Sequence, residues 1–163
     1  ATLLLLTSQT NFAAVGKVTE QTGPTEIVRN KKSMPSSVNS GVEMNDQIIT
    51  AKSKAKLTFE DNTTVNITEQ SKLVIDDFVY SGGGNSKGKL GLKVALGTVR
   101  YASGAIAHGN PKGVNIRTPT ATIAVRGTDF VMSVDEAGRS TVVLVPNCFD
   151  DKEIGRASCR ERV

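Results

Sequence analysis

The feature of this sequence that most constrains its fold is a polar–apolar alternation with a period of two between residues 15 and 145. Successive side chains of a β-strand point to opposite faces of the sheet, so this pattern places one face on a core and the other in water. The residues expected on the core face are Ala55, Leu57 and Phe59, then Val65 and Ile67, then Leu73 and Ile75, then Leu92, Val94 and Leu96, and finally Phe130, Met132 and Val134. We therefore expect an all-β fold without a long amphipathic helix.

Turn-forming residues separate these expected strands. Asp61-Asn62 lies between two alternating runs and suits a tight hairpin, because Asn tolerates positive φ better than most residues. Met44-Asn45-Asp46 offers a similar bend, and the Gly-rich stretches 81–88 and 107–113 are expected to be loops. Strands that recur at such short intervals predict a single compact domain, built as a two-layer β roll or sandwich or as a short β-helix.

The composition fits one globular domain and argues against a nucleic-acid partner. The chain has 163 residues, and chains of about 100–200 residues commonly form one domain. Its net charge of +4 comes from basic residues that are spread out, and aromatic residues make up only 4% of the chain. Nucleic-acid-binding domains usually concentrate Lys and Arg in a dense patch, often with stacking aromatics. We therefore do not expect the chain to bind nucleic acid.

Residues 1–14 contain no charged side chain. They are interpreted as the remnant of a secretory signal, whose apolar core is followed by small residues at Ala13-Ala14 where a peptidase cleaves. The alternative is a buried first strand, for which the polar run at 7–11 is poorly suited. The stretch is shorter than the roughly 20 apolar residues that a transmembrane helix needs. We expect an exported protein, periplasmic or extracellular, that does not span the membrane in this fragment.

The C-terminal residues 153–163 resemble the translation of a sequencing adapter, and we expect the natural protein to continue beyond this point. The expected organisation is a signal remnant at 1–14, a β domain at 15–148, the start of a downstream region at 149–152 and the adapter-like tail. Cys159 lies in that tail, so Cys148 is the one cysteine of the natural sequence here. It either pairs with a cysteine further downstream or is a single thiol.

Two local patterns resemble reactive sites without completing one. Residues 83–89 nearly match a phosphate-binding loop, but Leu90 stands where Ser or Thr would hold magnesium, and no helix pattern follows. His108 is the only histidine and lies in a Gly-rich stretch, where a surface loop position is expected. With no second histidine available, we expect no zinc site.

Two pairs of adjacent acids, Glu60-Asp61 and Asp76-Asp77, are interpreted as solvated turn carboxylates. Neighbours on a strand point to opposite faces, so neither pair makes a catalytic dyad by itself. The sequence thus predicts no catalytic, cofactor-binding or metal-binding residue, and we expect a protein that is not an enzyme.

Residues 116–130 resemble the signature of the FecR domain family. That signature is Thr-Pro, then a strand of small residues, then Val-Arg-Gly-Thr followed by an acid and Phe. Its residues in this chain are Thr118, Pro119, Val125, Arg126, Gly127, Thr128, Asp129 and Phe130. Segments 41–50, 57–67 and 96–100 resemble the family's upstream strands, so the resemblance covers roughly residues 15–145. Asn45 and Asn62 stand where the family commonly has Gly, and both positions are expected at positive φ.

The signature has a structural interpretation. Thr118-Pro119 lacks a backbone donor and is expected at a strand start or a sheet edge. Ala121, Ile123 and Val125 are expected to alternate into the core, and Gly127 to mark a bulge or a close backbone crossing. Arg126 and Asp129 are expected to hold the corner by hydrogen bonds.

The resemblance implies an extracytoplasmic, non-catalytic protein. Several members of the family regulate iron uptake as sigma-factor partners and have a membrane helix before the domain. In this chain the expected secretory signal lies directly before residue 15 and leaves no room for such a helix. We therefore predict a binding or scaffold module of the bacterial envelope, whose partner is another envelope protein or an anionic envelope polymer. The alternatives are a partner-sensing domain in cell-surface signalling and, as a third hypothesis, an envelope hydrolase.

Lys52, Lys54 and Lys56 recur at every second position, which would place three positive charges on one face of a strand. One interpretation is an edge strand that uses Lys to prevent aggregation. The other is an electrostatic contact for an anionic envelope polymer or an acidic partner surface.

Overall fold

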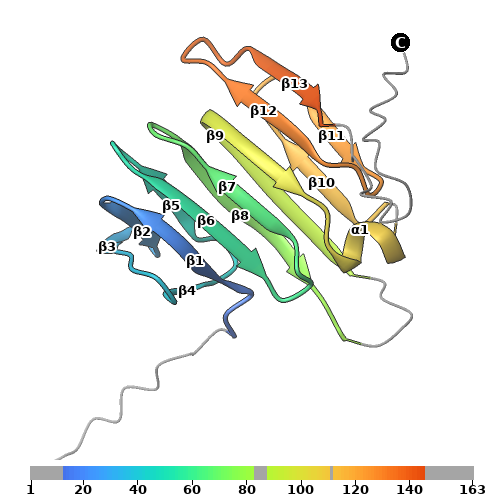
Figure 1. Ribbon diagram of the computed structural model, residues 1–163, viewed down its shortest axis with the longest axis horizontal. Coiled ribbons are helices and arrows are strands. Elements are labelled where there is room, and N and C mark those ends of the chain that lie inside the picture. The colour runs from blue at the N-terminus through green and yellow to red at the C-terminus, as the bar shows by residue number, and fades with distance from the viewer. Residues whose placement is uncertain (1–12, 83–87, 111, 146–163) are drawn as a thin grey trace, which may run out of the picture.

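The computed structural model of this chain describes residues 13–82, 88–110 and 112–145. These residues form 13 strands and the short helix α1, Ala105–Gly109 (Figure 1). The strands are β1 Gly16–Thr22, β2 Thr25–Arg29, β3 Lys32–Pro35, β4 Gly41–Val42, β5 Gln47–Thr50, β6 Lys54–Phe59, β7 Thr64–Ile67, β8 Lys72–Val79, β9 Lys89–Ala102, β10 Val114–Arg117, β11 Thr122–Val125, β12 Phe130–Val134 and β13 Ser140–Leu144. Within this part of the chain, no helical segment has the length and apolar character needed to cross a membrane.

The strands form two layers that share β9, which confirms the predicted all-β, two-layer domain. Sheet A has the order β4-β1-β6-β7-β9-β12-β13, and sheet B has the order β3-β2-β5-β8-β9-β10-β11. All pairs are antiparallel except β9 with β10. The first half of β9 pairs with β8 and β10, and its second half pairs with β7 and β12. A single strand therefore passes from one layer into the other.

Gly97 is the point at which β9 changes layer. Its φ is +90°, and the Cβ of any other residue would lie 2.6 Å from the Cα of Ser71. Ser71 immediately precedes β8 and is itself buried, so it has little freedom to move away. Only glycine satisfies both the left-handed conformation and the close approach.

The inward side chains of the two layers make one hydrophobic core. Its residues include Val18, Leu57, Phe59, Val65, Ile67, Val99, Phe130 and Met132 from sheet A, and Ile27, Ile48, Leu73, Ile75, Leu92, Val94, Val114 and Ile116 from sheet B. The predicted alternation is confirmed at twelve of the thirteen positions for which it was predicted, namely Ala55, Leu57, Phe59, Val65, Ile67, Leu73, Ile75, Leu92, Val94, Phe130, Met132 and Val134. Leu96 differs, because it is only half-buried, directly before the strand changes layer.

The predicted turns have the expected backbone geometry. Asn45 and Asn62 have φ of 65° and 64°, as predicted for positions where the family commonly has Gly.

The expected loop at 107–113 was partly wrong, because its first residues belong to α1. Lys89 opens β9, so no helix follows the phosphate-loop-like stretch, of which 83–87 lie outside the described residues. Residues 1–12 and 146–163 also lie outside the described residues. They include the expected signal core, Cys148 and the adapter-like tail.

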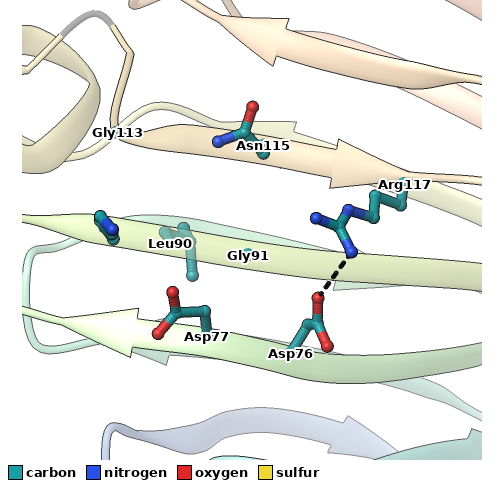
Figure 2. A pocket seen from close by; sticks show the side chains of 8 residues that line it. Asp76, Asp77, Leu90, Gly91, Gly113, Asn115 and Arg117 are labelled. Atoms are coloured by element: carbon teal, nitrogen blue, oxygen red, sulfur yellow. Dashed lines mark ion pairs between the residues drawn. The ribbon is translucent and has the colours of Figure 1, made fainter.

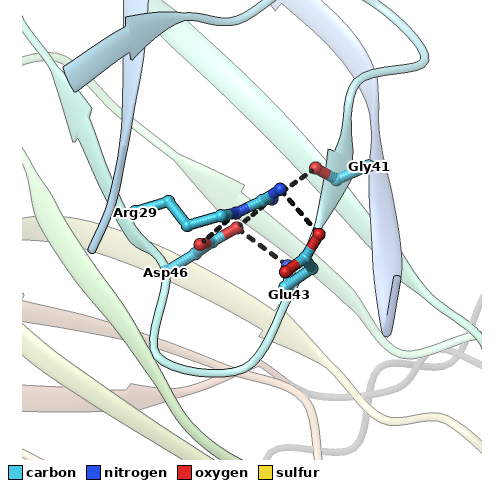
Figure 3. A network of polar contacts seen from close by, with 4 residues as sticks. All are labelled: Arg29, Gly41, Glu43 and Asp46. Atoms are coloured by element: carbon cyan, nitrogen blue, oxygen red, sulfur yellow. Dashed lines mark hydrogen bonds and ion pairs between the residues drawn. The ribbon is translucent and has the colours of Figure 1, made fainter. Parts of the chain in front are cut away.

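An ion pair between a partly exposed arginine and a buried carboxylate joins the sheets near the start of the domain. Arg29, at the end of β2, donates from Nε and Nη2 to the two carboxylate oxygens of Asp46, at 2.8 and 2.6 Å (Figure 3). Its Nη1 contacts Glu43 at 2.6 Å, and Nη2 also donates to the carbonyl of Gly41 at 3.2 Å. Asp46 is fully buried, and bidentate pairing with Arg satisfies its charge there. The contact fixes β2 of sheet B to β4 of sheet A.

The crossing at Gly97 gives a test of the fold. Gly97→Ala should lower the free energy of unfolding by about 2–4 kcal/mol, because it combines backbone strain with a clash against a buried neighbour. Gly82→Ala is the control, since a Cβ at Gly82 meets nothing within 4 Å. Chemical denaturation followed by circular dichroism measures both. Equal midpoints for the two variants would contradict the role assigned to Gly97.

Candidate functional site

The FecR-like signature begins at a turn rather than in a strand. Thr118 N donates to the carbonyl of Ala121 at 2.8 Å, and Ala121 N donates to Thr118 Oγ1 at 3.0 Å. Pro119 therefore occupies the second position of a turn between β10 and β11, where its fixed φ is favourable. The turn leaves Ala121 exposed and Ile123 half-buried, whereas Val125 is buried. The expected alternation into the core thus holds for Val125 and partly for Ile123, but was wrong for Ala121.

Gly127 lies in the connection from β11 to β12, with φ of +81°. A Cβ there would lie 3.1 Å from His108 Nδ1, so the backbone passes directly beside the end of α1. In place of the expected bulge or backbone crossing, Gly127 forms a turn whose close neighbour is the side chain of His108. His108 is exposed, as expected, but it belongs to the last turn of α1 and not to a loop.

Asp129 holds the corner through the backbone just after β9. Its Oδ1 accepts a hydrogen bond from Ser103 N at 2.9 Å, and Ser103 Oγ donates to the carbonyl of Thr128 at 3.1 Å. The expected pairing of Arg126 with Asp129 was wrong: within the described residues, no ion pair or hydrogen bond joins them. Arg126 is exposed. The reason is that the turn at Gly127 directs Asp129 toward the end of β9.

Phe130 completes the corner by stacking on Tyr101 of β9, with ring centroids 5.2 Å apart. Both rings are buried, and among the described residues no group has hydrogen-bond geometry to the Tyr101 hydroxyl, although Thr63 and Ser103 lie near enough to lower its pKa slightly. Burial raises the pKa of Tyr101 to about 12, because the phenolate would be poorly solvated there.

Asp61 was expected to be a solvated turn carboxylate, and the structure shows the opposite. It is fully buried, and its carboxylate accepts hydrogen bonds from Thr63 N at 3.1 Å, Thr63 Oγ1 at 2.7 Å and Ile106 N at 3.2 Å. Its carbonyl accepts from Ala105 N at 2.8 Å. Asp61 therefore holds the first turn of α1 against the β6–β7 hairpin. Together, the signature residues and their neighbours form a corner between β9, α1 and β12, in which the residues described above have structural roles.

The predicted lysine stripe is only partly a stripe. Lys54 and Lys56 share the outer face of β6, whereas Lys52 lies in the bend before that strand. The interpretation as an edge strand was wrong, because β6 pairs with β1 on one side and with β7 on the other. Lys56 Nζ contacts Glu20 Oε1 at 2.8 Å across the β1–β6 pair.

Strand register adds two further basic residues to this face. Lys17 lies opposite Thr58, and Arg100 lies opposite Asn66, which in turn lies opposite Lys56. We call the outer surface formed by Lys17, Lys54, Lys56 and Arg100 the cationic face. At the usual strand spacing, Lys56 and Arg100 are about 10 Å apart. Lys17 and Arg100 were missed from the sequence, because only the register shows that distant strands place them beside β6.

The outward strand positions around the cationic face are polar and carry few acids. Glu20 is the one carboxylate on the outward positions of these strands. Hydroxyl and amide side chains fill the positions between the cations, namely Thr58, Thr64, Asn66, Thr98 and Ser133. Because the salt bridge of Lys56 is exposed to solvent, it contributes little to stability, and the face keeps its positive potential.

The outer face of sheet B carries a different feature, a polar hollow of about 90 Å³ (Figure 2). Gly91 leaves it open, and Asp76, Asp77, Asn115 and Arg117 line it. A register shift in β8 next to Asp77 brings both carboxylates to this hollow, against the expectation that they point to opposite faces. Arg117 contacts Asp76 at 3.4 Å, and Lys89 also lines the hollow, so two cations balance the two carboxylates there.

Metal chemistry has no visible site in the described residues. In 13–82, 88–110 and 112–145, no group of three or more His, Cys, Asp or Glu side chains is placed to hold a metal ion. The arrangement of the cationic face suits electrostatic binding and offers no activated nucleophile.

The corner of the signature can be tested at its glycine. Gly127→Val should lower the free energy of unfolding by about 1–3 kcal/mol, since valine is strained at positive φ and contacts His108. A second variant that also carries His108→Ala should recover only the part due to the contact. Urea midpoints of the two variants and the wild type separate the contributions, and an unchanged midpoint for Gly127→Val would contradict the assignment.

Tyr101 gives a test by pH. Its raised pKa means that the folded state keeps the phenol proton longer than the unfolded chain, so stability should fall as pH rises from about 10 to 12, by on the order of 2 kcal/mol. Tyr101→Phe should remove that loss and change stability little at pH 7, because the hydroxyl has no partner to lose. Thermal denaturation at pH 7, 10 and 11.5 measures this; a strongly destabilised variant at pH 7 would show that the hydroxyl is bonded.

The comparisons with known proteins agree with the resemblance of the signature. The family model described as FecR protein matches residues 46–147. No curated protein and no solved structure matches the chain. The match starts after β1–β4, although β1 and β2 pair with β6 and β5 in the same sheets. Domains of this family are typically extracytoplasmic and take part in the regulation of cell-surface signalling. Since the match covers more than half of the sequence, the chain belongs to the FecR family.

Proposed function

We propose that this chain is an exported, non-catalytic binding module of the bacterial envelope, which contacts its partner through the cationic face. The observation that carries the proposal is the row Lys56–Asn66–Arg100, with Lys17 and Lys54 beside it and Glu20 as the one acid on the outward positions of the described strands around it. Exposed charges of one sign raise the association rate of an oppositely charged partner.

The chemistry of the face favours an anionic envelope polymer as that partner. Protein–protein interfaces are usually centred on buried aromatic or aliphatic anchors. No aromatic side chain is placed on the outward positions of β1, β6, β7 and the second half of β9, where Thr, Asn, Lys and Arg predominate. A flat surface of hydroxyls and cations is suited to a hydrated polymer with carboxylate or phosphate groups.

The family match favours a second candidate, the sensing of another envelope protein in cell-surface signalling. The full open reading frame separates the two proposals. A membrane helix encoded before the domain would favour signalling, whereas cell-wall-binding segments encoded after it would favour a scaffold.

The cationic face is tested by reversing its charges. Lys54, Lys56 and Arg100 are replaced by Glu, and the control replaces Lys32, Lys93 and Lys112, which are exposed and lie outside the face. The two variants have the same net charge. Co-sedimentation with purified peptidoglycan sacculi should fall by at least about tenfold for the first variant at roughly 20 mM salt, and wild-type binding should weaken at roughly 500 mM.

The control variant should keep most of its binding. That result would show that the loss of binding in the first variant is not due to its net charge alone. Circular dichroism verifies that each variant is folded. Equal sedimentation of the wild type and the cationic-face variant at low salt would refute the proposed surface.

A further inference from the structure

Strand β13 lies at the edge of sheet A (Figure 1) and exposes an unusual amount of apolar surface. Among the described residues it pairs only with β12. Val142, Val143 and Leu144 are 40%, 58% and 67% exposed, and they are consecutive. The strand carries no charge and no proline. In soluble proteins, charged residues or proline usually protect an edge strand from pairing with another chain. An apolar edge strand without them is a site for strand addition.

The hydrogen-bonding groups that face outward follow from the register. Val145 N donates to the carbonyl of Asp129 at 3.0 Å, just beyond the paired strands. In an antiparallel pair every second residue bonds to the neighbouring strand. Val143 and Thr141 therefore bond to β12, and the backbone groups of Ser140, Val142 and Leu144 point away from the sheet. These three residues are placed symmetrically about Val142.

We propose that β13 joins two copies of this chain in an antiparallel, two-fold symmetric pair centred on Val142. Val142 then bonds to Val142 of the other copy, and Ser140 bonds to the other copy's Leu144. In this register all outward N–H and C=O groups of the strand are satisfied, which gives about six backbone hydrogen bonds across the axis. A two-fold arrangement closes on itself and does not propagate into a fibre.

The side chains of the strand suit pairing with themselves. Val142 meets its own copy across the axis, and Thr141 lies beside Val143, so apolar and β-branched neighbours face each other. Because the strand is uncharged, the pair contains no like-charge contact. Ser140 is held in place by Thr118 at 2.7 Å and Thr120 at 2.9 Å, so the edge is already fixed in the single copy.

Charges at the two ends of β13 are complementary in this arrangement. Beyond Ser140 lies the β12–β13 turn, where Asp135 and Arg139 pair with each other at 2.7 Å and Glu136 remains exposed. Beyond Leu144 lies the β11–β12 turn with the exposed Arg126. Antiparallel pairing places Glu136 of one copy at the same end as Arg126 of the other. This complementarity favours a second copy over an unrelated strand.

The other edge strands lack these properties. In the described part of the chain, β3 carries Lys32 and ends at Pro35, and β4 is only two residues long. The edge strand β11 has no large exposed hydrophobic residue, because Ile123 packs against the core. The pairing surface is therefore assigned to β13.

The proposal is tested on the full chain by sedimentation velocity at about 10–200 µM, a range that resolves the affinities of small interfaces. The wild type should form dimers as concentration rises. Val142→Lys places two like charges across the axis and should raise the dissociation constant by at least about tenfold. Thr122→Lys, on the exposed edge of β11, is the matched control and should leave the dimer unchanged.

A second test uses the end charges and does not alter the strand. Arg126→Glu and Glu136→Arg should each weaken the dimer by about threefold, and the two changes together should restore it. Circular dichroism establishes that every variant is folded. A wild type that stays monomeric throughout this range would overturn the proposal. So would a dimer that Val142→Lys leaves intact, or open-ended assembly in place of a dimer.

Discussion

The close contact between Gly97 and Ser71 is the constraint on which the two layers depend. Because β9 is an inner strand of both sheets, the angle at which it passes between them fixes how the inward faces meet. The left-handed conformation of Gly97 turns the strand, and the absence of a side chain allows the approach to Ser71. Inward residues before the crossing are even-numbered, such as Leu92 and Val94, and those after it are odd-numbered, such as Val99 and Tyr101. The change of layer thus appears in the burial pattern as a change of phase.

The FecR signature stabilises the far end of the same strand. Asp129 binds the backbone of Ser103 just after β9, and Phe130 stacks on Tyr101 within it. Gly127 lets the chain pass His108, while Asp61 fixes the other end of α1 from the β6–β7 hairpin. The most specific sequence motif of this family therefore secures a corner, and the binding surface that we propose lies on strands whose outward residues are not part of it. A match to the signature therefore identifies the fold, whereas the binding partner has to be inferred from the residues on the outer faces of the sheets.

The alternation of residues was enough to predict the strands and most of the core, since burial on one face is a local property of each strand. Asn45 and Asn62 were also predictable, because few residue types tolerate positive φ. What depended on pairing between distant strands could not be predicted in the same way. Asp61 looks like a solvated turn residue until α1 is placed above it, and Arg100 joins Lys56 only once both are registered on Asn66. The interpretation of β6 as an edge failed for the same reason, since its two neighbours come from different parts of the chain.

The two proposed surfaces reinforce each other through geometry. In an antiparallel pair across a sheet edge, the two-fold axis is perpendicular to the sheet, so the outer faces of both copies point to the same side. The cationic faces of the two copies would then lie on the same side of the dimer, separated by β12 and β13 of each copy. A long anionic polymer that binds one face has the second within reach, so its local concentration there is high and the combined affinity exceeds that of either face. Weak, salt-sensitive contacts by Lys and Arg are thereby sufficient for retention on an envelope polymer, although each single face has no apolar anchor of its own.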